Sequence, residues 1–267
     1  MKTFIQAFIF VVLLVTINGC KKDGGNSSIN IFTIDDDKKL GLQVSQQIES
    51  DPKTYPLLNE SQYTTSYTYI RKIVTNILNS GKVYYKDQFV WQTKIIKNDS
   101  VLNAFCTPGG YIYVYTGLIK FLDSEDKLAG VLAHEIAHAD RRHATNQMTK
   151  AYGLTTLIEV VLGKNPGLLA SIANNLLTLE FSREDEAEAD KYSVIYLCPT
   201  QYNADGAAAF FQKLISSGQG TNTPAFLSTH PSPDNRIKNI ENEKTTLGCT
   251  GNQTYTTEYA NFVKTLP

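Results

Sequence analysis

Two histidines and a glutamate form the pattern His-Glu-x-x-His at His134, Glu135 and His138. On a helix, residues four positions apart lie on one face, so both imidazoles can reach a single metal ion. Glu135 then stands beside the ion, where it can accept a proton from a water molecule. The alternative is a histidine pair that is solvated or satisfied within the core. Apolar neighbours such as Leu132 and Ile136 argue against it, because burying imidazoles and a carboxylate without a partner is costly.

A third protein ligand must come from another segment, since two histidines on one helix do not complete a metal site. The best candidate is the acidic stretch that begins at Ser182, a residue that can cap a helix. Within it, Arg183, Glu186 and Asp190 share one helix face. Alone, such a run is usually a solvated helix face. Combined with the histidine pattern, it predicts Glu186 as the third ligand and Asp190 as a carboxylate that accepts the N–H of a ligating histidine.

Four motifs resemble those of the gluzincin peptidases related to the CAAX prenyl proteases. Relatives in that family include membrane heat-shock proteases and soluble periplasmic peptidases that act in outer-membrane assembly, and this chain looks like a lipoprotein of the soluble branch. The motifs span roughly residues 36–245 and occur in the family's order. They are Asn103-Ala104-Phe105-x-x-Pro108-Gly109-Gly110, His134-Glu135-x-x-His138 with Arg142-His143, Ser182-Arg183-x-x-Glu186-x-x-x-Asp190, and His230-Pro231-x-x-x-x-Arg236-Ile237.

The resemblance implies one bound Zn²⁺ per chain and assigns a role to each site residue. The implied zinc ligands are His134, His138 and Glu186. Glu135 would be the general base, and Asp190 a proton donor or orienting group. His230 would be a mobile group near the metal, able to stabilise a developing oxyanion or, as in some relatives, to occupy the open zinc position and hold the enzyme latent. Outside this pattern, a histidine before a proline is more often structural.

The distribution of apolar residues and the motifs together predict an α+β fold that is mainly α and zincin-like, with a small β-sheet whose edge strand lines the active-site cleft. Helical spacing occurs in residues 40–48 and 67–78, and strand residues occupy 89–96. In residues 102–117, alternation places three tyrosines on one face. That stretch is either an edge strand beside the metal, to which an extended peptide adds as a further strand, or a plain half-buried hairpin.

The remaining segments are expected to surround the helix that carries the two histidines. Asp123-Ser124 can cap this helix. His143 follows His134 by nine residues, which is about two and a half helical turns, so we expect it to point away from the metal and to be structural. Residues 149–179 replace the spanning helices of membrane-bound relatives and form either a lid over the cleft or a core helical hairpin. Further helices are predicted over residues 203–217 and 233–247, followed by a short closing helix.

The N-terminal segment predicts export. Residues 1–19 have the composition of a lipoprotein signal peptide, and Ile17-Asn18-Gly19-Cys20 resembles the lipobox before a lipidated cysteine. Residues 20–34 then form a flexible tether and residues 35–267 a single metallopeptidase domain. An ordinary secretory signal with an incidental cysteine is the alternative. The first interpretation places the protein in the cell envelope, anchored through Cys20, in the outer membrane facing the periplasm.

Three cysteines remain if Cys20 carries lipid. In an oxidising compartment we expect one pair, Cys198 with Cys249, and a buried, reduced Cys106.

The formal net charge is −1 and no basic stripe occurs, which argues against a nucleic-acid partner. The sequence therefore predicts a zinc-dependent endopeptidase of the cell envelope that cleaves misfolded or unassembled polypeptides. One alternative is a largely latent, chaperone-like quality-control protein with a masked zinc site. A weaker alternative is a zinc hydrolase that acts on bonds other than peptide bonds.

Overall fold

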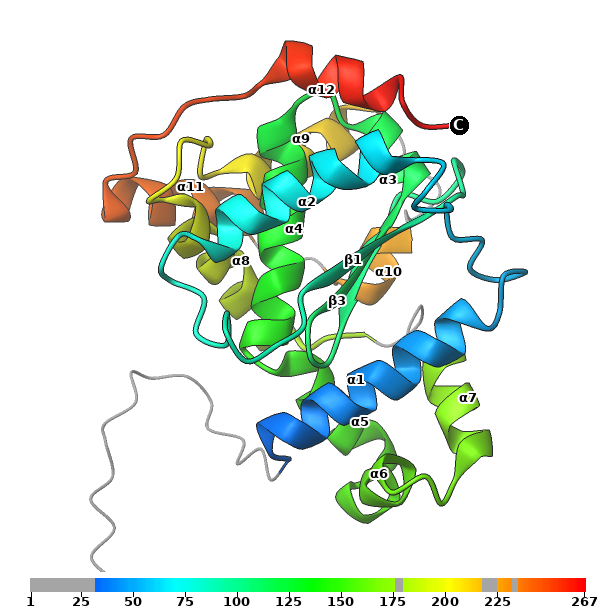
Figure 1. Ribbon diagram of the computed structural model, residues 1–267. Helices are drawn as coiled ribbons and strands as arrows, with labels where there is room; N and C mark the ends of the chain where they lie inside the picture. The colour runs from blue at the N-terminus through cyan, green and yellow to red at the C-terminus, as the bar shows by residue number, and fades with distance from the viewer. Residues whose placement is uncertain (1–31, 176–179, 218–224, 232–234) are drawn as a thin grey trace, which may run out of the picture.

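The computed structural model describes residues 32–175, 180–217, 225–231 and 235–267. The expected signal peptide and most of the expected tether lie outside these residues. The described chain is mainly helical with one small sheet, as predicted (Figure 1). In chain order the elements are α1 (Ile34–Glu49), α2 (Thr64–Leu78), β1 (Gln92–Ile96), β2 (Ala104–Thr107), β3 (Tyr111–Tyr115), α3 (Thr116–Phe121), α4 (Glu125–Asp140), α5 (His143–Tyr152), α6 (Leu154–Val161), α7 (Pro166–Asn175), α8 (Arg183–Leu197), α9 (Gly206–Ser216), α10 (Ala225–Thr229), α11 (Arg236–Leu247) and α12 (Thr256–Val263).

The sheet has the strand order β1-β3-β2, with β1 parallel and β2 antiparallel to β3. The tyrosine-bearing strand β3 is therefore central, and β2 is the edge strand that packs against α4. The turn between β2 and β3 depends on Gly110, which has φ +90° and whose added Cβ would lie 2.9 Å from the Trp91 ring. A glycine is needed there because other residues rarely adopt that φ and have no room.

Alternation along the strands separates two hydrophobic clusters. Ile95, Ile112 and Val114 point into the first cluster, with buried residues of α2, α4, α8 and α9. Tyr113 and its neighbours Tyr111 and Tyr115 point into the second, with residues of α1, α6 and α7. This is the period-two pattern expected of a strand buried on both faces.

Helix α4 is the centre of the larger cluster and packs against α8 and α9 (Figure 1). Gly130 allows the close approach to α9, because a Cβ there would lie 2.1 Å from the backbone nitrogen of Ala207. Gly206 on α9 is equally constrained, with an added Cβ 2.1 Å from the carbonyl oxygen of Asp126. The two helices therefore meet backbone to backbone, which fixes α4 firmly.

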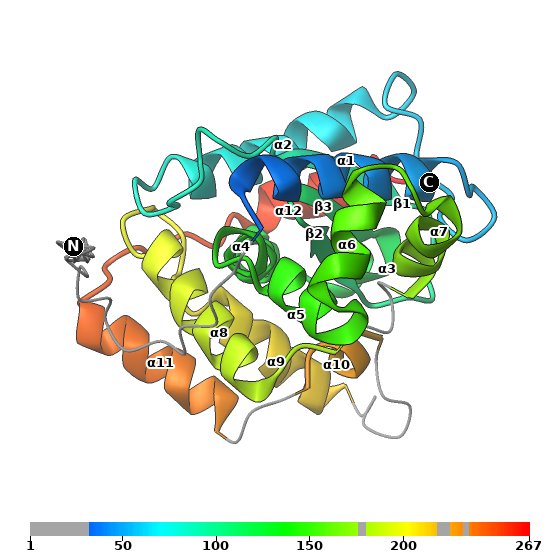
Figure 2. The ribbon, with the colours of Figure 1, turned by 90° about the horizontal axis from the view of Figure 1, so that it is seen from below.

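Residues 149–175 form a layer with α1 rather than an isolated flap. Helices α6 and α7 pack on α1, and Leu157, Val160 and Ile172 are buried there (Figure 2). The Tyr55 hydroxyl donates a hydrogen bond to the carbonyl oxygen of Ala173, at 3.0 Å. The described part of this stretch therefore packs on α1 as one layer of the molecule.

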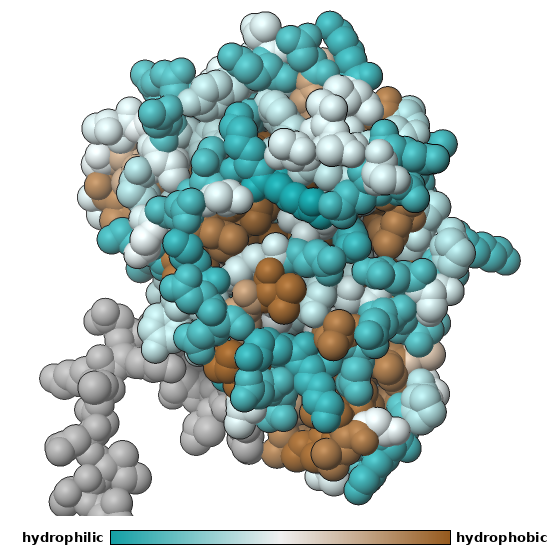
Figure 3. Space-filling model, in the orientation of Figure 1, coloured by the Kyte–Doolittle hydropathy of each residue, from teal (hydrophilic) through white to brown (hydrophobic). Residues whose placement is uncertain are grey.

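Figure 3 shows apolar residues at the end of the molecule where α6 and α7 lie. Ile158 and Leu162 are exposed in this region. No helix in the described ranges has the length and apolar character that a bilayer crossing requires.

Thr33 is the N-cap of α1, and its hydroxyl forms a capping box with Asp36. Cys198, at the C-terminal end of α8, forms the expected disulfide with Cys249, while Cys106 is free and buried.

Candidate metal centre

The two histidines of the pattern lie one turn apart on α4, as the helical spacing predicts. Their Nε2 atoms are 3.0 Å apart. His134 Nδ1 lies 3.0 Å from Asp190 Oδ1. Because an ionised carboxylate is only an acceptor, His134 must carry a hydrogen on Nδ1, and in its neutral form the lone pair of Nε2 then faces His138. Two nitrogens on a tetrahedral ion at ~2.05 Å would lie about 3.3 Å apart, close to the observed spacing.

Glu186 reaches this pair from α8. Ser182 begins the helix with a capping box to Asp185, so the helix starts one turn before the site. The carboxylate of Glu186 lies 3.2 Å from His138 Nε2 through Oε1 and 3.4 Å from His134 Nε2 through Oε2. The structure therefore brings together the three residues that the sequence analysis assigned as ligands.

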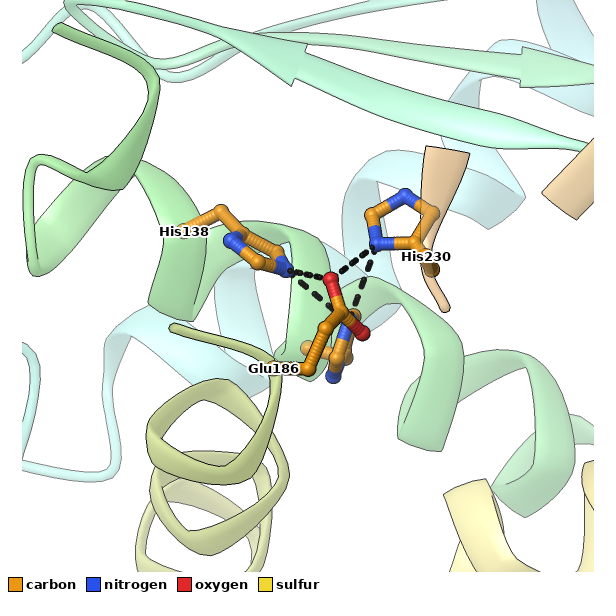
Figure 4. A group of neighbouring side chains, drawn as sticks. His138, Glu186 and His230 are labelled. Atoms are coloured by element: carbon orange, nitrogen blue, oxygen red, sulfur yellow. Dashed lines mark hydrogen bonds and ion pairs between the residues drawn. The ribbon is translucent and has the colours of Figure 1, made fainter. Parts of the chain in front are cut away.

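His230 joins them from the segment that follows α10. Its Nδ1 lies 2.8 Å from Glu186 Oε1 and 3.4 Å from His134 Nε2. Figure 4 shows Glu186 directed from α8 toward His138 and His230. One ligand atom from each of His134, His138, Glu186 and His230 lies within 4.8 Å of the others, and all four residues are buried. In this conformation His230 occupies the position of a fourth ligand.

Glu135 lies beside this group without a hydrogen-bond partner. Neither of its carboxylate oxygens forms a hydrogen bond within the described chain, and His230 Nε2 lies 3.5 Å from Oε1. A buried carboxylate normally has such a partner. Burial raises the pKa of Glu135 above its ordinary value, as suits a group that takes up a proton during a reaction.

The residues present fit a metal ion. Three imidazoles and a carboxylate converge, with lone pairs facing one another and unpaired acceptor oxygens beside them, in an interior where such groups need a cation. Burial lowers the pKa of His138 well below its ordinary value. Burial acts against ionisation of Glu186, but His230 and His134 outweigh it and hold its pKa well below the usual range. His138 is therefore unprotonated and Glu186 ionised, and these are the forms that bind a cation.

His134 differs from His138 in its proton affinity. Burial lowers the pKa of His134, but Glu186 and Asp190 outweigh that effect and raise it to about 9. Metal binding at neutral pH must therefore displace a proton from this residue.

Arg236 is a buried residue of the site to which the sequence analysis gave no role, although it lies in one of the motifs. Its Nε is 2.6 Å from Asp190 Oδ2, and one Nη donates to Asp190 Oδ1 at 2.7 Å and lies 2.9 Å from Glu186 Oε2. The guanidinium also stacks on Phe211, 4.0 Å from the ring centroid. Arg236 thus fixes two carboxylates and offsets their charge.

His143 is not among the residues that converge on the candidate metal site, as expected, but the continuous helix on which that expectation rested is not observed. Helix α4 ends at Asp140, Arg142 adopts a left-handed conformation with φ 62°, and His143 begins a new helix, α5. The chain therefore turns back, and His143 Nδ1 lies 3.1 Å from His138 Nδ1. The counting argument assumed one continuous helix from His134 to His143, whereas α4 ends at Asp140.

Comparison with known proteins agrees with this geometry. The profile of peptidase family M48 matches residues 65–244. The chain is 26% identical over 262 residues to "Metalloprotease LoiP" of Escherichia coli (strain K12), covering 91% of this chain and 98% of that protein. It is 29% identical over 239 residues to "Beta-barrel assembly-enhancing protease" of Yersinia pestis, covering 82% and 46%.

A third relative is "Mitochondrial metalloendopeptidase OMA1" of Schizosaccharomyces pombe, 28% identical over 216 residues, with 79% of this chain and 62% of that protein covered. The match thus spans about half of the Yersinia protein and under two thirds of the yeast protein, but almost all of LoiP. The family profile covers more than half of the chain and includes all the residues described above. The chain belongs to peptidase family M48.

Proposed function

We propose that this protein is a zinc-dependent endopeptidase of the bacterial cell envelope. The observation that supports the proposal most directly is the convergence of His134, His138 and Glu186 on one point, with the unpaired carboxylate of Glu135 beside them. Nitrogen and carboxylate ligands in a compact group suit Zn²⁺. Two histidines and a glutamate are a ligand set of catalytic zinc sites that cleave peptide bonds.

Zinc, when bound, would polarise the scissile carbonyl and lower the pKa of a nearby water molecule. Glu135 accepts the proton of the attacking water and returns it to the leaving amine. Asp190 accepts the N–H of His134 and thereby keeps the Nε2 lone pair directed into the site. Arg236 holds Asp190 and Glu186 in place.

The proposed substrates are misfolded or unassembled envelope polypeptides. The name of one relative, a beta-barrel assembly-enhancing protease, supports a link to protein assembly. The proposed location is the outer membrane facing the periplasm, with a lipid on Cys20 as the membrane anchor. The lipobox-like residues support the anchor, and they lie outside the described residues. Nucleic acid is not among the proposed partners.

A second proposal, a largely latent quality-control protein, is favoured by one observation. His134, Glu135, His138, Glu186 and His230 are each at most 1% exposed, and His230 Nδ1 lies 2.8 Å from Glu186 Oε1, within the group of candidate ligands. This conformation therefore holds the components of the site together but leaves no open ligand position. Both proposals share the same metal site and differ in how often His230 leaves it.

Metal analysis combined with two substitutions tests the proposed activity. Glu135→Gln should keep about one zinc per chain and lose roughly 10²–10⁴-fold in kcat/KM on unfolded casein, because only the proton acceptor is removed. His134→Ala should lose both metal and activity. Glu184→Gln, which alters an exposed carboxylate of α8, is the matched control. If Glu135→Gln cleaves as fast as the parent, Glu135 is not the base; if purified parent protein binds no metal and ignores chelators, the proposed function is wrong.

A further inference from the structure

We propose that His143, supported by Glu188, is a positioning residue for the metal ligand His138 and sets the tautomer in which His138 can bind metal. The inference rests on the metal site of the proposed function and adds two residues to which the sequence analysis gave no role in metal binding. The two residues come from different elements, since His143 begins α5 and Glu188 lies in the second turn of α8. Together they form a chain of contacts that runs from the metal ligand to the protein surface.

The contacts of this chain are short and directed. His143 Nδ1 lies 3.1 Å from His138 Nδ1, and His143 Nε2 lies 3.1 Å from Glu188 Oε2. The other oxygen of Glu188 accepts a hydrogen bond from Arg141 Nε at 2.8 Å. His143 is 2% exposed, whereas the Glu188 side chain is 31% exposed. A buried imidazole is thus held between a metal ligand and a fixed carboxylate.

The carboxylate determines where each hydrogen lies. Ionised Glu188 can only accept, so the neighbouring His143 must carry a hydrogen on Nε2. Neutral His143 then presents the lone pair of Nδ1 to His138, and His138 must donate from its own Nδ1. The Nε2 of His138, which faces Glu186 and His134, is left with the lone pair that a metal needs.

The reverse direction of the same contact would block the site. If His143 donated from Nδ1, neutral His138 would carry its hydrogen on Nε2, directed at Glu186 Oε1 and occupying the lone pair. Glu188 therefore favours the metal-binding tautomer of His138 through the intervening His143. The other ligand, His134, achieves the same result directly through Asp190. His134 is thus oriented by a direct contact with a carboxylate, and His138 by a contact relayed through His143.

Zinc affinity and the absorption spectrum of the cobalt-substituted protein test this role. Zinc affinity is measured by competition with a chromophoric chelator, so the readout does not depend on activity. His143→Phe keeps a ring in the buried site but removes the acceptor, and it should weaken zinc binding about 10–100-fold and shift the Co²⁺ d–d bands. Glu188→Gln should weaken binding in the same direction but less, because the amide oxygen can still accept. Glu184→Gln on the same helix is the control and should match the parent.

A conservative replacement separates a positioning role from simple packing. In His143→Asn the amide oxygen stands near the place of Nδ1 and can accept from His138, so most of the affinity lost in His143→Phe should return. If His143→Phe does not fold, Glu188→Gln and His143→Asn decide the matter. Parental affinity and spectrum in Glu188→Gln and in folded His143→Phe would overturn the inference. A parent protein that binds no zinc would instead overturn the proposed function, so the two failures are distinguishable.

Discussion

The ring of Phe181 stacks on the imidazole of His138, with centroids 3.9 Å apart and planes inclined by 25°. The centroid of the Phe181 ring also lies 5.4 Å from that of His230. The backbone N–H of Phe181 donates a hydrogen bond to the carbonyl oxygen of Thr229 at 3.1 Å. His230 in turn stacks on Phe226, with centroids 4.3 Å apart. The side chains of Phe181 and Phe226 therefore help to hold His230 among the candidate metal ligands. Phe181 itself is partly exposed.

Removal of the Phe181 ring should increase the activity of the resting enzyme. An aromatic contact of this kind contributes about 0.5–1.5 kcal/mol, so Phe181→Ala should raise the population with His230 displaced, and the initial rate on casein, roughly 2–10-fold. Tyr84→Ala, which removes an exposed aromatic ring elsewhere, is the control. A rate equal to or below that of the parent, with zinc content unchanged, would show that Phe181 does not stabilise the closed state.

His230→Ala distinguishes a masking role from a role in oxyanion stabilisation. In this conformation His230 lies 2.8 Å from Glu186 Oε1, inside the metal group, so its removal should free a ligand position and increase kcat/KM. A histidine that stabilised the oxyanion would show the opposite effect, a loss of about 10²–10³-fold in kcat. Steady-state kinetics at matched zinc occupancy decides between them.

Gly130→Ala should destabilise the protein because α4 and α9 meet there without room for a methyl group. The added Cβ would lie 2.1 Å from the backbone nitrogen of Ala207, and backbone cannot move aside as a side chain does. Overpacking costs about 1–3 kcal/mol, and this contact lies at or above the upper end. Gly167→Ala on α7, where no atom lies within 4 Å, should be neutral or stabilise by about 0.4–1 kcal/mol. Urea unfolding of both variants measures the difference, and equal free energies would contradict the close approach.

Loss of the disulfide should lower stability without removing a site residue. Cys198 and Cys249 are 51 positions apart in the sequence. In the chain-entropy description, closing a loop of this size contributes about 4 kcal/mol to the free energy of unfolding. The Cys198→Ser/Cys249→Ser double variant should unfold at correspondingly lower urea concentration, with zinc affinity retained in the folded protein. Reduction of the parent should reproduce the loss, and an unchanged midpoint in both experiments would argue against the bond.

The stability of the metal-free protein should depend on Glu188 at acid pH. The hydrogen bond from His143 lowers the pKa of this carboxyl, burial opposes the shift, and Arg141 adds to it, giving a value of about 2 instead of the usual 4.5. A depressed folded-state pKa contributes stability that is present above pH 4.5 and is lost as the pH falls toward 2. In chelator-treated samples, the free energy of unfolding of Glu188→Gln should therefore fall less than that of the parent between pH 4.5 and 2. Parallel pH profiles for parent and variant would show that the ion pair does not contribute.

The sequence alone determined the local geometry of the site. The spacing of His134 and His138 fixes two imidazoles on one face, because the helical repeat depends only on the backbone. Ser182 and Asp185 likewise specify where α8 begins, since a capping box is formed within four residues. The alternating tyrosines of β3 specify a strand with two distinct faces, and the expected pairing of Cys198 with Cys249 is confirmed.

Tertiary structure decided which groups meet. The position of β3 in the centre of the sheet depends on a parallel pairing with β1, which no local pattern encodes. Arg236 reaches the site through the packing of α11 on α8 and α9, and His230 follows α10, whose Phe226 contacts Phe210 and Phe211 of α9. Their distances are set by side-chain volumes distributed over the core. His143 returns to His138 because a left-handed residue at Arg142 ends α4. A left-handed conformation at a non-glycine residue costs about 1–3 kcal/mol locally, so the surrounding contacts, rather than the residues at the turn, determine it.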